Sequence, residues 1–182
     1  MNKVLFLLAM LLMFDMCHAA TPAVERPTYS EGDYWVYTVG DKDVKITFVR
    51  EEKDRYIFEK GGTHVVKDFN LIPVRDKSGG FPGLMVKFPL TVGKWWDFTF
   101  EADDTTSKRE SKRIAKYVVE SYDQITVPAG TLWAFKITFT VVEGKFGHTL
   151  KSGSYWYAPE VKSIIKSSFK DEPLELKRYK VK

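Results

Sequence analysis

The chain has 182 residues, 44% of them hydrophobic and 15% aromatic, which is enough for one domain with its own core. Its 28 basic and 24 acidic residues give a net charge of +4, and the two signs are mixed along the sequence. Mixed charges are typical of solvated strand faces, so we expect no nucleic-acid partner. An anionic lipid surface fits the excess of positive charge better.

The first twenty residues have the order of a secretory signal peptide. Lys3 provides a short basic start, residues 4–14 are an almost unbroken apolar run, and Cys17 and Ala19 stand at the −3 and −1 positions of a cleavage site. The run is shorter than the about 20 apolar residues that a membrane-spanning helix needs. We therefore expect residues 1–20 to be removed and residues 21–182 to form a single β-rich domain, exported to the periplasm or the extracellular space.

Cys17 is the only cysteine, and a cysteine after an apolar run can instead carry a lipid. The lipid-attachment motif prefers a leucine-like residue three positions before the cysteine and a small residue directly before it. Those positions hold Phe14 and Met16, with Asp15 between them. The sequence thus favours a free exported protein over a lipoprotein, and a mature chain without Cys17 forms no disulfide.

The remainder of the chain predicts one strand after another. Short runs of alternating apolar and polar residues are separated by turn signals such as Gly40-Asp41, Gly61-Gly62 and Pro128-Ala129-Gly130. The predicted strands are 34–39, 44–50, 55–60, 63–67, 70–74, 85–88, 94–102, 113–122, 131–142, 154–157, 163–169 and 174–181. This pattern indicates an all-β fold, an antiparallel meander that forms a half-barrel or open barrel, with a β-sandwich as the alternative.

Two of the predicted strands show which side chains should be buried. In segment 131–142, alternate residues should share one dry face: Trp133, Phe135, Ile137, Phe139 and Val141. In segment 94–102, a second dry face should carry Trp96, Phe98, Phe100 and Ala102. Trp95 should then lie on the opposite face of that strand, because neighbouring residues of a strand point to opposite sides.

The sequence offers no catalytic or metal-binding signature. Beyond residue 20 only His64 and His148 remain, far apart and without another histidine or a cysteine at ligand spacing. Adjacent carboxylates such as Asp103 and Asp104 point to opposite faces of an extended chain, which does not suit paired acid–base catalysis. We therefore expect a non-enzymatic protein without a cofactor or a bound metal. An enzyme of unknown class ranks third, after the two binding hypotheses given at the end of this section.

The aromatic residues are the feature that points to a ligand. They occur in clusters, and an exposed Trp or Tyr can line an apolar pocket or stack on a sugar, although large aromatics also simply fill a core. The candidate ligand-binding residues are Trp35, Trp95, Trp133, Trp156 and Tyr157.

Three motifs occur in order: FPLTVGKW at 88–95, VPAGT at 127–131 and YWYAPEV at 155–161, preceded by EGDYW at 31–35. Together they resemble a family of uncharacterised exported bacterial envelope proteins that contain a domain of unknown function. The resemblance implies a β-rich periplasmic or secreted domain, broadly similar in shape to the open barrels of bacterial lipoprotein carriers. It implies no activity and no catalytic residue. Pro128 and Gly130 also suit a tight turn into the following strand.

These observations predict a non-enzymatic, exported, monomeric β protein that binds an apolar or amphiphilic, lipid-like ligand on an aromatic-lined concave face. The alternative is a structural or interaction domain that docks on an envelope protein without a small ligand.

Overall fold

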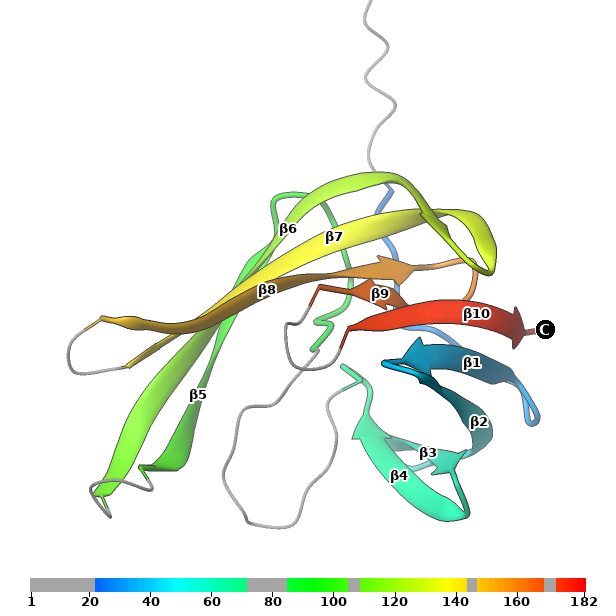
Figure 1. Cartoon of the computed structure of the whole chain (residues 1–182), viewed down its shortest axis with the longest axis horizontal. Coiled ribbons are helices and arrows are strands. Elements are labelled where there is room, and N and C mark those ends of the chain that lie inside the picture. Colours follow the sequence, from blue (N-terminus) through cyan, green and yellow to red (C-terminus); the bar gives the residue numbers. More distant parts are fainter. Residues whose placement is uncertain (1–21, 72–84, 105–108, 144–146, 169–172) are drawn as a thin grey trace, which may run out of the picture.

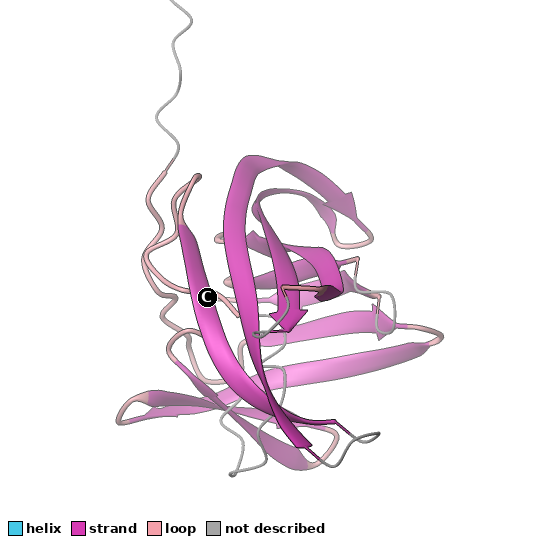
Figure 2. Cartoon of the chain, turned by 90° about the vertical axis from the view of Figure 1, so that its left-hand side faces the viewer, coloured by secondary structure: helices cyan, strands magenta, loops and turns pink. Residues whose placement is uncertain are grey.

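The computed structural model describes residues 22–71, 85–104, 109–143, 147–168 and 173–182, and the predicted signal peptide lies outside these ranges. The described residues form strands and loops, without a helix (Figure 2). Hence no helical segment among them could cross a membrane. The strands are β1 (Tyr34–Val39), β2 (Lys42–Glu52), β3 (Arg55–Lys60), β4 (Thr63–Asp68), β5 (Trp95–Asp104), β6 (Arg109–Val127), β7 (Gly130–Glu143), β8 (Thr149–Ala158), β9 (Ser163–Ser167) and β10 (Leu174–Lys180).

All ten strands belong to one antiparallel sheet with the order β4-β3-β2-β1-β10-β9-β8-β7-β6-β5 (Figure 1). Neighbours in this order are also neighbours in the sequence, except that the last strand, β10, pairs with the first, β1. The two outermost strands, β4 and β5, are not paired with each other, so the curved sheet stays open. The predicted open half-barrel is therefore confirmed, and the alternative of a two-sheet sandwich is wrong.

The turn signals set most of the strand limits. β1 and β3 have the predicted bounds, and Val127 pairs with Gly130 across the predicted Pro128 turn. Gly130 adopts a φ of 128°, which a residue with a side chain rarely accepts, so the glycine suits this turn.

Two predicted strands, 70–74 and 85–88, are wrong where the structure describes them. Asn70 and Leu71 lie in a turn and coil after β4, while residues 72–74 are outside the described ranges. Met85 and Val86 are buried, and the Val86 N–H donates to the Asn70 carbonyl at 3.0 Å, yet neither segment joins the sheet. Short apolar runs can thus be buried as loops that cover the concave face.

The two predicted dry faces are buried except at two places. Phe135, Ile137 and Phe139 are at most 2% exposed, but Trp133 is 49% exposed. At this end of β7 the neighbours of Trp133, Leu132 and Ala134, are the buried residues, so the opposite face of the strand is the dry one there. Phe98, on the same face as Trp96 and Phe100, is 37% exposed. The dry-face prediction is therefore wrong for Trp133 and Phe98. The side chain of Ala102 lies outside the described part.

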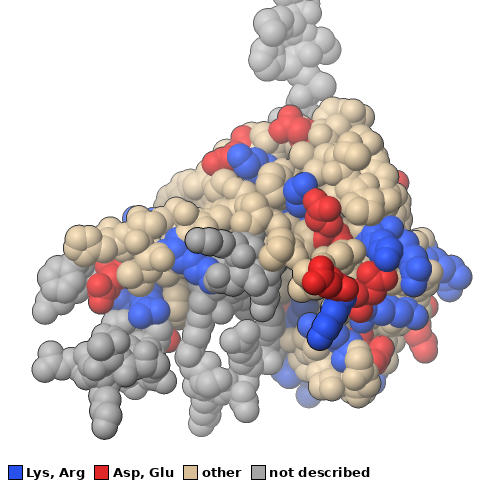
Figure 3. All heavy atoms as spheres, viewed as in Figure 1, with Lys and Arg blue, Asp and Glu red and all other residues tan. Residues whose placement is uncertain are grey.

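Aromatic rings fill the concave side of the first strands. The ring of Tyr29 lies 4.9–5.5 Å from the rings of Trp35, Phe48, Tyr56 and Phe58, measured between centroids. These contacts hold residues 22–33 across the concave face. On the surface, basic and acidic side chains are intermingled, most densely over β1, β2 and β10 (Figure 3).

Candidate functional site

Two of the five predicted ligand residues, Trp35 and Tyr157, belong to the core. Each is 1% exposed. The indole Nε1 of Trp35 donates a hydrogen bond to the Val161 carbonyl at 2.7 Å, and the ring of Tyr157 packs edge-on against Phe88 at 5.4 Å. Burial also raises the pKa of the Tyr157 hydroxyl far above its usual value. Both side chains use their surface for packing inside the protein.

The other three predicted residues lie elsewhere and do not form one surface with them. Trp95 is 71% exposed at the start of β5, and Trp133 stacks on Tyr122 with ring centroids 5.4 Å apart near the β6–β7 turn. Trp156 is partly buried and stands opposite Lys136 in the sheet register, on the outer face. The structure thus does not gather the five aromatics into one site, and their role in binding stays a prediction.

A different group of residues gathers at the open edge of the sheet, on β4. In the β3–β4 register, Lys67 stands opposite Tyr56, and Val65 stands opposite Phe58. Tyr56 and Phe58 are buried on the concave side, so Lys67 and Val65 face the same side. The Lys67 Nζ lies over the Phe58 ring, 5.3 Å from its centroid.

The residue after β4 extends this group. Phe69 is half-buried, and its ring lies 5.0 Å from that of Tyr56. Arg26 covers the other side of Phe69, with its Cζ 3.9 Å from the ring centroid, and its Nη1 is 3.9 Å from a carboxylate oxygen of Glu51. We call the five residues Tyr56, Phe58, Val65, Lys67 and Phe69 the β4 corner.

The charge in the β4 corner belongs to Lys67, whose side chain is half-buried. Burial lowers the pKa of the Lys67 ammonium to about 8, with a smaller contribution from the nearby Lys60. Among the described residues no carboxylate forms an ion pair with Lys67. Among the described residues, the neighbour over which this half-buried ammonium lies is the ring of Phe58.

Another buried charge in the same sheet is fully satisfied. Asp33 is 1% exposed, and its carboxylate accepts hydrogen bonds from the backbone N–H groups of Ser30 and Lys182, at 2.9 and 3.0 Å. The Lys162 Nζ lies 3.8 Å from the same carboxylate. Asp33 thus has both hydrogen-bond donors and a nearby lysine, whereas Lys67 forms no ion pair with a carboxylate of the described residues.

Among the described residues, two side-chain polar atoms are buried without a hydrogen-bond partner, and both are donors. They are the indole Nε1 of Trp96 on β5 and the Nε of Arg113 on β6. Trp96 stands opposite Tyr117, and Arg113 stands opposite Phe100, so both belong to the concave face. The two ends of the open sheet therefore both carry unused donors on the same side.

Sequence reasoning missed Lys67, although one signal for it exists. Val65 and Lys67 are two residues apart, so a strand that places Val65 on the dry face places Lys67 there too. Only the pairing with Tyr56 and Phe58 shows which face of β4 is the dry one. As for metals, no cluster of three or more His, Cys, Asp or Glu side chains suited to an ion occurs within the described ranges.

No family model and no curated protein matches the chain. Among solved structures, the hypothetical lipoprotein YmcC from Escherichia coli aligns over 85% of this chain and 89% of its own, with 7% identity and a TM-score of 0.49. A Bacteroides fragilis protein described as exported, with a YmcC-like fold, covers 87% of this chain and 100% of its own, with 15% identity and a TM-score of 0.41. A protein described as a lipoprotein from Parabacteroides distasonis covers the same shares, with 14% identity and a TM-score of 0.43. Nothing about activity follows from these values.

Proposed function

We propose that this protein is an exported, non-enzymatic binding protein for an amphiphile that has an apolar tail and one anionic head group. The observation that carries the proposal is Lys67, a half-buried ammonium over the ring of Phe58 whose pKa is lowered by burial and which forms no ion pair with a carboxylate of the described residues. The expectation of export comes from the signal-peptide pattern of residues 1–20.

A cation in this position costs folding free energy, because burial removes water that would otherwise solvate it. An anionic group beside the Lys67 Nζ would offset that cost with a charge-assisted hydrogen bond, which contributes about 1.5–3 kcal/mol. The half-buried side chains of Val65 and Phe69 would offer an apolar tail a contact surface next to the head group.

The other unused donors support the same chemistry. Trp96 Nε1 and Arg113 Nε are buried donors that lack an acceptor among the described residues. A ligand that brings oxygen acceptors to the concave face is the simplest way to satisfy groups of this kind. A purely apolar ligand would leave every one of them unpaired.

The open sheet gives such a ligand a route to the concave face. β4 is an end strand of the sheet, and Lys67 is the fifth of its six residues. A head group can therefore reach the amine from the edge without separating paired strands. This edge position distinguishes the β4 corner from the closed core around Trp35.

The test compares oleate with oleyl alcohol, which has the same chain but no charge. Binding of each probe is measured by native mass spectrometry and by titration of intrinsic fluorescence. We expect Lys67→Met to weaken oleate binding at least tenfold and to leave oleyl alcohol unaffected, since only the head-group contact is lost.

Lys45→Met is the matched control. Lys45 also lies over an aromatic ring, with its Nζ 4.7 Å from the Tyr34 centroid, but it is exposed. Equal oleate affinity of wild type and Lys67→Met would contradict the proposal. Failure of the wild type to bind oleate at all would favour a docking domain without a small ligand.

A further inference from the structure

The outer face of the β5–β6 hairpin carries an exposed apolar group. Trp95 is 71% exposed, more than any other large hydrophobic residue that the structure describes. It stands directly opposite Val118 on β6, which is 41% exposed, so the two side chains are neighbours on one face. Val92, in the turn before β5, is 37% exposed.

The packing of the neighbouring residues holds the Trp95 side chain on the outer face. The next residue, Trp96, is 3% exposed on the concave side, where its ring stacks almost parallel on Tyr117 at 5.3 Å. Backbone hydrogen bonds from Gly93 to Val119 at 2.9 Å and from Val119 to Lys94 at 2.8 Å pin the preceding turn to β6. Because neighbours in a strand point to opposite faces, Trp95 is held outward as long as Trp96 is buried.

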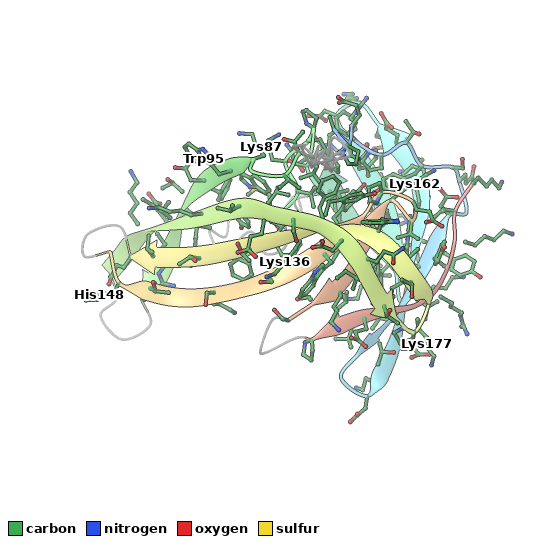
Figure 4. All side chains as sticks on the ribbon, turned by 90° about the horizontal axis from the view of Figure 1, so that it is seen from above. Lys87, Trp95, Lys136, His148, Lys162 and Lys177 are labelled. Carbon is green, nitrogen blue, oxygen red and sulfur yellow. The ribbon has the colours of Figure 1, made fainter. Side chains whose placement is uncertain are left out.

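Two lysines flank the apolar group. The side chain of Lys94 donates a hydrogen bond to the Pro89 carbonyl at 2.6 Å. Burial and the charge of Lys87 both lower the pKa of Lys94, and Glu25 only partly opposes them. Lys87 and Trp95 lie toward the same edge of the molecule in the view of Figure 4. We call Val92, Trp95, Val118, Lys87 and Lys94 the Trp95 patch.

We propose that the Trp95 patch is a docking surface for a lipid bilayer that contains anionic head groups. A tryptophan beside aliphatic residues, with lysines at the margin, is the combination that favours the membrane interface, where the ring is half in water and half in lipid. Phosphate groups would also relieve the repulsion between the two lysines.

The size of the patch points the same way. A stable protein–protein interface buries about 800 Å² per partner and uses roughly 20–30 residues a side. Three exposed apolar side chains fall well short of that, whereas contact with lipid has no minimum area and gains from the attraction between basic side chains and anionic lipids. This inference goes beyond the proposed ligand function, because the Trp95 patch and the β4 corner are on opposite faces and opposite ends of the sheet.

The experiment uses the full chain and sedimentation with vesicles of phosphatidylcholine, alone or with 30% phosphatidylglycerol. Trp95→Ser is compared with Trp133→Ser, which removes another exposed tryptophan outside the patch. Every variant keeps residues 1–21, so differences in binding belong to the substituted site. We expect Trp95→Ser to lower the partition coefficient at least fivefold on mixed vesicles and Trp133→Ser to leave it unchanged.

The lysines provide an independent readout. Replacing both Lys87 and Lys94 with Gln should weaken binding to the anionic vesicles about fivefold per lysine and leave the weak binding to pure phosphatidylcholine unchanged. Brominated lipids should quench the fluorescence of wild type more than that of Trp95→Phe. Equal partitioning of Trp95→Ser and wild type would overturn the proposal. So would a concentration-dependent dimer that Trp95→Ser abolishes, since a second copy would then cover the patch.

Discussion

Replacing Lys67 with Met should stabilise the free protein while it weakens ligand binding. In the folded protein burial lowers the pKa of Lys67 from 10.5 to about 8, a difference equivalent to about 3 kcal/mol of unfavourable interaction with the charged form. The substitution removes that cost at pH 7 and also loses the cation–π contact with Phe58, which contributes about 1–2 kcal/mol. We expect a net gain of about 1–2 kcal/mol in the free energy of unfolding.

The pH dependence gives the sharper measurement. Below pH 8 the amine is protonated in both the folded and the unfolded chain, and the cost of the buried charge is fully present. As the pH rises from 8 toward 10.5, the folded chain releases its proton and the unfolded chain keeps it, so stability increases with pH. For these two values the gain between pH 7 and 9.5 is about 2 kcal/mol.

Urea unfolding followed by circular dichroism at pH 7 and pH 9.5 checks both statements. The wild type and the exposed-lysine control Lys45→Met should gain stability between the two pH values, and Lys67→Met should lack this gain. Tyrosine ionisation in the unfolded chain begins below pH 10 and lowers stability equally in all three proteins, so the quantity to compare is the difference between Lys67→Met and the other two. If Lys67→Met were less stable than wild type at pH 7, or kept the same rise with pH, the reasoning about an unpaired buried charge would be refuted.

Three further predictions concern the rest of the molecule. Trp35→Phe should cost about 1–3 kcal/mol in urea unfolding, because it leaves the buried Val161 carbonyl without its donor at 2.7 Å; an unchanged midpoint would contradict this role. Trp133→Ala should shift the unfolding free energy by less than about 1 kcal/mol, since the side chain is 49% exposed, and a larger loss would mean that its stacking matters for folding. Lys136 lowers the pKa of Glu120, whose Oε2 lies 2.7 Å from the amine. The small contribution of this ion pair to the free energy of unfolding should be present above the ordinary glutamate pKa and disappear as the pH falls through the lowered value. Titration of Glu120 by NMR in wild type and in Lys136→Gln checks the direction.

Local signals in the sequence were sufficient for much of the architecture. Alternating residues and glycine turns predicted β1 and β3 with their observed bounds, because strand period and turn chemistry act over a few neighbouring residues. The same signals predicted strands at 70–74 and 85–88, where burial takes the form of loops. An apolar run in the sequence indicates that a segment is buried, but it does not show whether the buried segment is a strand of the sheet or a loop packed against it.

The candidate sites depended on longer-range pairing. The alternation in segment 94–102 predicted Trp96 on the dry face and Trp95 on the opposite one, and the stacking of Trp96 on Tyr117 confirms it. It did not predict that the outer face would leave Trp95 71% exposed. Likewise, Lys67 is an ordinary strand lysine until β3 places Tyr56 and Phe58 beside it.

The sequence by itself thus determined the all-β class, the run of strands and the alternation of faces, since each follows from contacts between near neighbours in the chain. Only the tertiary structure decided the sheet order, in which β10 joins β1 and leaves β4 and β5 as open edges. It also decided which aromatics are core and which face solvent. These features depend on residues more than a hundred positions apart, such as Trp35 and Tyr179, and no local pattern records that they meet.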